Sequence, residues 1–350
     1  MFISRISVGL ALSKRAVLLC SYQLQRILDR RMSSQTPEQK LEAFGYAFND
    51  AGQLRQINPE DKSLTDKPFK FDITDNRSKN QENYDAIGEV ITEYVYKLLS
   101  DMGLYKIYVP SPETPDSVFV FGTKPSFENT NKLLILIHGS GVVRAGQWSR
   151  SLIINHSLDH GTQIPYIKRA IAEGYDVLLM NSNLNYRYAN GKRTPIKGHS
   201  TPEEHVITVW KHLIQPVFKT IECFAIIGHS YGGIATVALT NAFPIAIMNK
   251  CFAIGFTDSV HSASDFSSEM LEWCQLHARN YVTSQEPLGT KLKSRDNDIP
   301  YWSSGHTKHE FTSWACIDEM FPFLESQRLN WLERLPELKY PAGDGKKIAY

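Results

Sequence analysis

Hydrophobic residues along this chain gather in short continuous runs that alternate with longer segments of helical spacing. The strand-like runs are Tyr105–Val109, Val118–Phe121, Leu133–Ile137, Val177–Met180, Phe224–Ile227, Phe252–Phe256 and Tyr281–Thr283. The helix-like segments are Asn83–Leu99, Ile164–Ala172, Pro202–Leu213 with Thr201 as N-cap, Ile234–Ala242 and Phe311–Leu324. Uninterrupted aliphatic strands are typical of a sheet buried on both faces. The alternation therefore predicts an α/β fold with a mostly parallel central sheet covered by helices on both faces.

The remaining pattern divides the chain into one large domain and its flanks. We expect a polar linker over residues 32–42, a single domain over 43–330 and a polar tail over 331–350. Within the domain, Phe44–Ile57 alternates aromatic and polar positions around Asn-Asp-Ala-Gly, which predicts a small hairpin. Two polar stretches are predicted to be surface loops: 184–200 and 288–304.

The amino terminus differs from the rest in composition. Residues 1–31 contain six arginine or lysine residues and a single acidic residue, Asp29. Such a basic segment is typical of a mitochondrial presequence, and it equally fits an extension that precedes a start at Met32. Both interpretations are kept, and they lead to different compartments.

Composition excludes several classes of function. Basic and acidic residues nearly balance, 38 against 37, so no overall field attracts nucleic acid or an anionic membrane. The five cysteines form no C-x-x-C pair, which indicates reduced thiols in place of a disulfide framework or a zinc site. No phosphate-binding glycine loop or metal-ligand spacing occurs, so we expect neither cofactor nor metal, and the apolar runs are too short to span a bilayer.

A candidate nucleophile follows the strand-like run at 224–227. Residues 228–232 read Gly-His-Ser-Tyr-Gly, the pattern of a turn that exposes Ser230 between a strand and a helix. The two glycines allow neighbouring backbones to approach closely. The alternative interpretation is a tight turn without chemistry. The flanking strand and helix favour the nucleophile elbow of an α/β-hydrolase.

A glycine-containing loop in the expected position supplies a candidate oxyanion hole. His138-Gly139-Ser140-Gly141 directly follows the aliphatic strand at 133–137. Hydrolases of this fold place here a backbone N–H that binds the oxyanion, and a second donor follows the nucleophile. We therefore expect the donors among Gly139, Ser140 and Tyr231.

Two carboxylates are candidates for the acid of a catalytic triad. Asp258 follows the run at 252–256, and Glu286 follows the run at 281–283. In this fold the acid follows the nucleophile in the chain and precedes the histidine. The usual acid of this fold follows the second strand after the nucleophile, which favours Glu286, whereas a known variant places it after the first strand, where Asp258 is the better-shaped candidate. Asp258 is preferred, and Glu286 remains the alternative.

Late histidines are candidates for the general base. His309 begins the last helical segment, His306 is the alternative, and His261 lies close enough to Asp258 in sequence to compete. With His309 the chain order Ser, acid, His is complete. The residues alone thus predict a serine hydrolase acting on an unknown small acyl substrate such as an ester, thioester or amide.

Longer motifs resemble those of the Argonaute-binding-protein-two (Arb2) domain family, which includes animal cotranscriptional regulators of alternative splicing and a domain of fungal class II histone deacetylases. The resemblance covers about residues 40–330 and rests on six segments: 44–49, 133–150, 161–165, 229–233, 257–261 and 309–314. The insertion at 184–200 is shorter than in the animal members. The ending of the chain also lacks an endoplasmic-reticulum retrieval signal.

The resemblance implies an α/β-hydrolase-like fold used by adaptor proteins of RNA silencing, heterochromatin and splicing. Argonaute, chromatin or splicing proteins are then the implied partners, and the nucleus or cytoplasm is the implied compartment. By position, Ser230, Asp258 and His309 match a triad-like set in the family. Two functions therefore stand side by side after the sequence: an adaptor and an active serine hydrolase.

Overall fold

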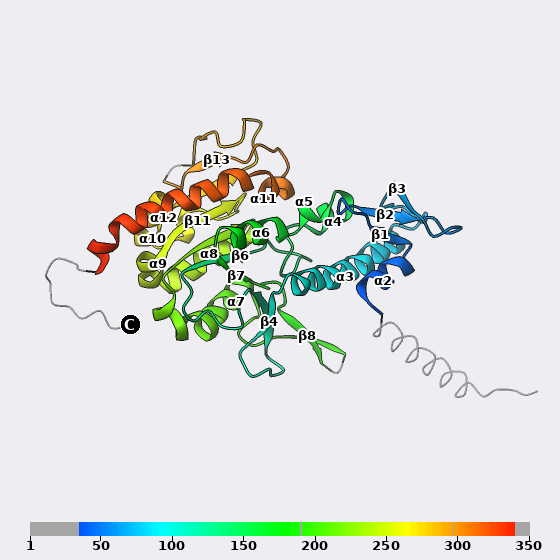
Figure 1. Cartoon of the computed structure of the whole chain (residues 1–350), viewed down its shortest axis with the longest axis horizontal. Coiled ribbons are helices and arrows are strands. Elements are labelled where there is room, and N and C mark those ends of the chain that lie inside the picture. The colour runs from blue at the N-terminus through cyan, green and yellow to red at the C-terminus, as the bar shows by residue number, and fades with distance from the viewer. Residues whose placement is uncertain (1–34, 190, 296, 340–350) are drawn as a thin grey trace, which may run out of the picture.

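An eight-stranded β-sheet forms the centre of the computed structural model, which describes residues 35–189, 191–295 and 297–339 (Figure 1). Its strands are β4 (Tyr105–Val109), β5 (Val118–Gly122), β6 (Lys132–Ile137), β7 (Asp176–Leu179), β10 (Cys223–His229), β11 (Cys251–Thr257), β12 (Ala278–Val282) and β13 (Tyr301–Ser303). They lie in the order β4-β5-β7-β6-β10-β11-β12-β13, and only β5 runs antiparallel to its neighbours. The predicted, mostly parallel sheet is confirmed. Its order, with a serine turn after the fifth strand, is that of an α/β-hydrolase-like fold.

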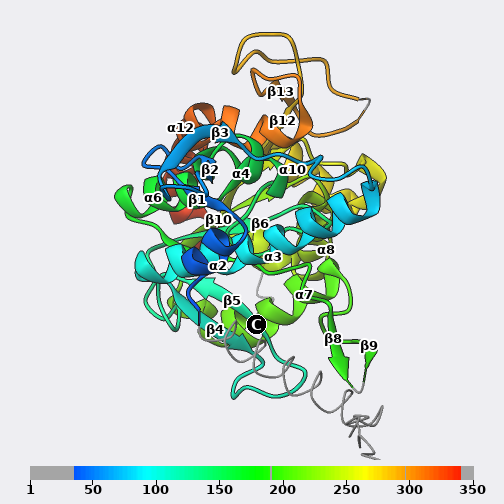
Figure 2. The ribbon, with the colours of Figure 1, turned by 90° about the vertical axis from the view of Figure 1, so that its right-hand side faces the viewer.

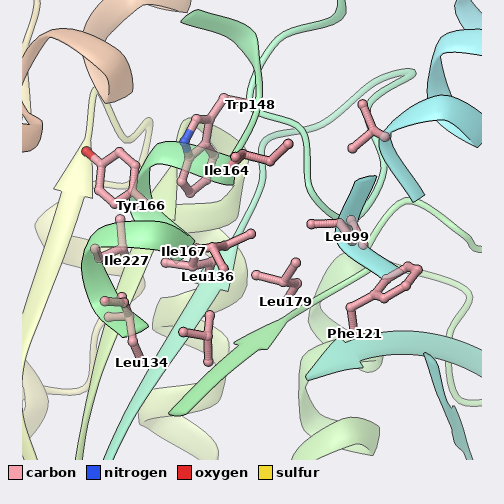
Figure 3. Close-up of a cluster of buried hydrophobic side chains, with 14 of the residues drawn as sticks. Leu99, Phe121, Leu134, Leu136, Trp148, Ile164, Tyr166, Ile167, Leu179 and Ile227 are labelled. Atoms are coloured by element: carbon pink, nitrogen blue, oxygen red, sulfur yellow. The ribbon is translucent and has the colours of Figure 1, made fainter. Parts of the chain in front are cut away.

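Helices cover both faces of this sheet because its central strands are apolar on both sides. In β6, Leu134 and Leu136 belong to one buried cluster, whereas Leu133 and Ile135 belong to the other. The first cluster, part of which Figure 3 shows, packs against α3 (Arg77–Asp101), α6 (Ile164–Ala172) and α12 (Ile317–Lys339). The second packs against α7 (Pro202–Val209), α8 (Tyr231–Ala242), α9 (Pro244–Lys250) and α10 (Ser268–His277).

A small three-stranded sheet lies at one end of the molecule, beside α2 and α3 (Figures 1 and 2). The predicted hairpin is confirmed as β1 (Tyr46–Phe48) and β2 (Leu54–Ile57), and β3 (Leu64–Pro68) adds a strand. The linker prediction for 32–42 was wrong over its second half, because Pro37–Ala43 forms α2. Thr36 and Gln39 make a reciprocal capping box that starts this helix, and Leu41 is buried beneath it.

The carboxyl-terminal prediction also needs correction. The segment predicted as one helix contains a 3₁₀ turn at His309–Phe311, then α11 (Thr312–Ala315) and then α12, which continues to Lys339. Residues 331–339 are therefore helical and not a polar tail. Trp331 is buried, and its indole N–H donates to the Asn249 carbonyl oxygen at 3.2 Å. The basic segment 1–31 and residues 340–350 lie outside the described residues.

The two predicted surface loops contain regular structure. Residues 184–200 form a hairpin of β8 (Tyr186–Ala189) and β9 (Lys192–Pro195), which projects from the body of the molecule (Figure 2). The stretch 288–304 contains the edge strand β13. The helix predicted to begin at Pro202 is capped by Thr201 as expected but passes into a π-helical turn at Trp210–Ile214.

Two short helices, α4 (Arg150–Asn155) and α5 (Leu158–Gly161), precede α6 in the chain. Within the described ranges, no single helix is both long and apolar enough to cross a membrane. Only α8 and α9 taken together have that length and composition, and they meet at a bend of 99°.

Candidate active site

Ser230 occupies the turn between β10 and α8 in a backbone conformation that non-glycine residues rarely adopt. Its φ is 53° and its ψ is −121°. The Ser230 N–H donates to the Thr257 carbonyl oxygen at 3.1 Å, and the Gly233 N–H donates to the Ser230 carbonyl oxygen at 3.0 Å. A Cβ atom at Gly232 would lie 2.4 Å from the Ile137 carbonyl oxygen, so only glycine fits there. The sequence thus folds this turn as a sharp strand-to-helix elbow.

The glycine loop after β6 lies directly against the elbow. A Cβ atom at Gly139 would lie 3.1 Å from the Ser230 Cβ atom, which shows how closely the two backbones approach. Ser140 follows on the exposed side of the loop, and Tyr231 begins α8. The three residues expected to supply oxyanion donors therefore border the serine from two different segments.

Two side chains, the half-buried Asn183 and the buried His138, fix the conformation of this loop. The Asn183 amide donates to the Gly139 carbonyl oxygen at 2.9 Å and to the Val143 carbonyl oxygen at 3.1 Å. The His138 Nδ1 atom lies 2.8 Å from the Gly139 carbonyl oxygen. Burial lowers the pKa of His138 to about 4, so this ring is neutral at physiological pH and donates through Nδ1.

Asp258 and His309 form a hydrogen-bonded pair next to the elbow. The His309 Nδ1 atom lies 2.7 Å from Asp258 Oδ2, and the Thr283 N–H donates to Asp258 Oδ1 at 3.3 Å. The hydrogen bond to this carboxylate raises the pKa of His309 above its ordinary value. Since Nδ1 is engaged, Nε2 is the ring nitrogen that can accept a proton.

The alternative site residues have other surroundings. Glu286 is exposed, and its backbone, not its carboxylate, is held by Ser303 Oγ at 2.7 Å. His306 stacks on Phe311 with ring centroids 4.3 Å apart, and its Nδ1 accepts the Lys308 N–H at 3.1 Å. The structure therefore pairs His309 with Asp258 and does not bring Glu286 or His306 to that carboxylate.

His261 is also directed away from Asp258. Its Nδ1 lies 2.6 Å from Ser259 Oγ, and its Nε2 lies 3.6 Å from an oxygen of Asp298. The ring is fully buried and packs against Phe256. His261 thus stabilises the chain behind Asp258 and does not compete for it.

Ser230 and His309 make no direct hydrogen bond in the described residues. Over the described part of the chain, the Ser230 hydroxyl has no hydrogen-bond partner. The centre of the His229 ring lies 5.0 Å from the centre of the His309 ring. The His229 Nδ1 atom lies within hydrogen-bonding distance of the Thr257 carbonyl oxygen, at 2.9 Å, and of Thr257 Oγ1, at 3.1 Å. In hydrolases without substrate this hydrogen bond is often long, and it shortens when substrate binds.

Both Ser230 and Asp258 have positive φ angles. Asp258 has φ 47°, and three further non-glycine residues of the described chain share this property: Lys62, Asn129 and Asn297. Such conformations cost about 1–3 kcal/mol each and persist where surrounding contacts impose them. Strain at two site residues, one at the elbow and one directly after β11, indicates that the fold maintains this geometry at a cost in stability.

Sequence reasoning missed several residues that support the site. Asn183 follows β7 and fixes the glycine loop, and the Tyr231 hydroxyl donates to Glu203 at 2.7 Å. Thr257 Oγ1 lies 2.7 Å from Ser313 Oγ and so ties the His309 segment to the sheet. The polar run 181–183 at a strand end was the one local signal for Asn183.

The described residues contain no cluster of candidate metal ligands. No group of three or more histidine, cysteine, aspartate or glutamate side chains is arranged to hold a metal ion there. The four cysteines of that part of the chain are buried free thiols: Cys223, Cys251, Cys274 and Cys316. Burial raises the pKa of each thiol, which keeps it protonated.

Comparison with known proteins finds a family model and several relatives that match this chain. The Arb2 domain model matches residues 37–288. The chain is 38% identical over 359 residues to "Cotranscriptional regulator ARB2A" of Homo sapiens, covering 86% of this chain and 84% of that protein. It is 33% identical over 323 residues to "Cotranscriptional regulator ARB2A homolog" of Dictyostelium discoideum, covering 81% and 79%.

The solved structures that resemble this chain have lower sequence identity to it than these relatives. A histone deacetylase from Saccharomyces cerevisiae superposes with a TM-score of 0.46 at 15% identity, covering 69% of this chain and 98% of that chain. A thermostable esterase superposes with a TM-score of 0.41 at 15% identity, covering 65% and 64%.

Proposed function

The chain belongs to the Arb2 domain family, and from that premise we propose that Ser230 is the nucleophile of a serine hydrolase centre. The substrate class is an acyl compound: an ester, thioester or amide. The observation that carries the proposal is the Asp258–His309 pair, at 2.7 Å, whose imidazole lies 5.0 Å from the ring of His229, the residue directly before the strained Ser230.

Each site residue has a definite role in this mechanism. Ser230 Oγ attacks the acyl carbonyl carbon while His309 Nε2 takes the hydroxyl proton, and Asp258 orients and stabilises the imidazolium. Backbone N–H groups from the Gly139–Ser140 loop and Tyr231 bind the oxyanion. His309 returns the proton to the leaving group, and a water molecule then releases the acyl group from Ser230 by the same path.

A fluorophosphonate probe tests the proposal directly. Wild-type protein should be labelled, and Ser230→Ala should not. Asp258→Asn should be labelled more slowly by orders of magnitude, because the triad members act as a unit. Ser259→Ala is the matched control, since its hydroxyl faces His261 and not Ser230 or His309. Absence of labelling in correctly folded wild-type protein would overturn the proposal.

A second candidate function is regulation of transcription-coupled events, and the names of the relatives support it. The human and Dictyostelium relatives, at 38% and 33% identity, are both called cotranscriptional regulators. We propose by this likeness that the chain acts in the nucleus, with chromatin or splicing proteins and Argonaute as the partners to test. Capture from nuclear extract that recovers no such protein would argue against this role.

The two candidates can be separated with one variant. If the chain is a hydrolase, Ser230→Ala should lose the probe labelling of the wild type, whereas partner binding by an adaptor should be the same in wild type and Ser230→Ala. Localisation is tested by expressing the full chain and a chain that starts at Met32. Nuclear signal from the shorter chain supports the regulatory role, whereas import of the longer chain into mitochondria supports the presequence interpretation of residues 1–31.

A further inference from the structure

A polar cavity of about 540 Å³ opens beside the candidate nucleophile. Ser140 and Arg144 line it from the loop after β6, Arg193 from the β8–β9 hairpin, Glu203 from α7, and Tyr231 from the start of α8. Ser140 follows Gly139, which packs against Ser230, and Tyr231 directly follows Ser230, so neighbours of the elbow line the cavity. Its volume is within the range of small-molecule sites, about 300–1,000 Å³.

Arg193 presents an uncompensated positive charge to this cavity. Its guanidinium group lies 3.8 Å from the centre of the Tyr186 ring, on the same hairpin. Within the described ranges it has no carboxylate partner. By contrast, Arg187 of this hairpin is paired with Asp116 at 2.8 Å. Stacking fixes the plane of the Arg193 guanidinium while its N–H groups stay available to a ligand.

Arg144 is the second positive group, and it is held by the oxyanion loop itself. Its Nη1 atom donates to the Val143 carbonyl oxygen at 3.0 Å. Val143 is also the acceptor for Asn183, the side chain that fixes the loop. Arg144 likewise lacks a carboxylate partner among the residues described. The position of this charge is therefore coupled to the position of the expected oxyanion donors.

Glu203 is the one carboxylate among the residues that line the cavity, and it is already engaged. One of its oxygens accepts the Tyr231 hydroxyl at 2.7 Å. Two arginines against one glutamate leave the lining with a formal charge of +1. A planar guanidinium matches carboxylate and phosphate oxygens through paired hydrogen bonds.

We propose that this cavity binds an anionic group, carboxylate or phosphate, at the far end of the acyl substrate, with Arg144 and Arg193 as its ligands. The inference rests on the proposed hydrolase function for the substrate, but anion binding itself does not require catalysis. Ser140 and Tyr231 join the two regions, so a ligand held by the arginines extends toward Ser230. The enzyme then selects acyl chains that end in a negative charge.

Matched ester substrates test the selectivity. The mono-4-nitrophenyl ester of adipic acid and 4-nitrophenyl hexanoate have the same chain length and differ by a terminal carboxylate. Wild-type kcat/KM should favour the charged ester by at least ~10-fold, the effect of one charge-assisted hydrogen bond. Arg144→Gln and Arg193→Gln should each lower this preference by about 10-fold. Lys192→Ala, an exposed hairpin neighbour outside the cavity, should preserve it.

Calorimetric titration separates this proposal from the hydrolase function. Adipate and inorganic phosphate are titrated into Ser230→Ala protein and into the same protein carrying Arg144→Gln or Arg193→Gln. Binding that both arginine variants weaken supports the site even if no ester is turned over, and the tighter of the two anions identifies the group. No binding of either anion, or binding and ester preference that survive both substitutions, would overturn it.

Discussion

The imidazole of His309 lies 2.7 Å from the carboxylate of Asp258, although 51 residues separate them in the chain. Asp258 directly follows β11 and is tied to β12 by its own N–H, which donates to the Tyr281 carbonyl oxygen at 2.8 Å. His309 begins a 3₁₀ turn whose conformation Thr312 supports with a 2.8 Å hydrogen bond to the His309 carbonyl oxygen. Two rigid supports therefore hold this pair.

Asp258→Asn should lower the pKa of His309. The hydrogen bond that His309 donates to the Asp258 carboxylate raises that pKa, and an uncharged amide cannot stabilise the imidazolium equally. The ring should then titrate at lower pH, as NMR of its carbon-bound protons would measure. If the site hydrolyses esters, the acid limb of kcat/KM should move to lower pH, and the rate should fall about 10³–10⁴-fold.

The raised pKa of His309 also determines how the effect of Asp258→Asn on stability changes with pH. A raised pKa in the folded state stabilises the protein below the pKa of the unfolded chain, and this contribution disappears as pH rises through the folded value. Asp258→Asn should therefore destabilise more at pH 6 than at pH 9. Glu286→Gln is the matched control because that carboxylate is exposed. A larger effect from Glu286→Gln on His309 would show that the pairing is wrong.

Ser230→Gly should stabilise the protein by about 1 kcal/mol while it abolishes probe labelling. Ser230 has a φ of 53°, a conformation that glycine adopts without a steric penalty. Urea unfolding measures the change. Asn129→Gly, at an exposed position with φ 54°, provides a comparison remote from the site. Loss of stability in Ser230→Gly would mean that the serine hydroxyl, and not strain, dominates at the elbow.

Gly139→Ala should slow fluorophosphonate labelling about 10–100-fold. The new Cβ atom would lie 3.1 Å from the Ser230 Cβ atom, which is closer than carbon atoms normally pack, so loop and elbow must separate. That shift misaligns the oxyanion donors with the serine. The melting temperature should change little by comparison. Labelling at the wild-type rate would indicate that the Gly139 loop does not contribute to the oxyanion site.

The sequence alone predicted the parts of this molecule that depend on local pattern. Continuous apolar runs became β6 and β10, and the glycines around Ser230 became an elbow, because both outcomes depend on neighbours in the chain. The choice between Asp258 and Glu286 stayed open because each follows a strand. It depends on where the segment carrying His309 folds back, which no local spacing encodes.

Contacts between residues far apart in the sequence account for the other differences between the predictions and the structure. Asn183 donates to the Gly139 carbonyl across 44 residues, and Trp331 donates to Asn249 across 82. The first fixes the oxyanion loop, and the second extends the last helix past the predicted boundary. The β8–β9 hairpin was interpreted as a loop because its stretch of the chain is largely polar, and the aromatic residues of β8, Tyr186 and Tyr188, are exposed and bury no face of the hairpin.

His199 and His205 form a buried pair that should make the protein sensitive to acid. Their Nδ1 atoms lie 2.9 Å apart, His199 Nε2 lies 3.1 Å from the Val109 carbonyl oxygen, and His205 Nε2 accepts the Asn181 N–H at 3.1 Å. His205 must therefore donate through Nδ1, and His199 must accept. A second proton on either ring would set two donors against each other, and burial lowers the pKa of both.

Stability should fall as pH decreases below about 6.5, where the unfolded histidines bind protons that the folded pair excludes. Each such histidine contributes up to about 1.4 kcal/mol per pH unit to this slope. His205→Gln keeps one donor and one acceptor but cannot titrate. Its free energy of unfolding, from urea titrations between pH 7.5 and 5, should therefore fall less steeply by about that amount. If the free energy of unfolding of His205→Gln fell with pH as steeply as that of the wild type, the buried pair would have to bind protons in the folded state. The hydrogen bonds of the pair oppose such binding.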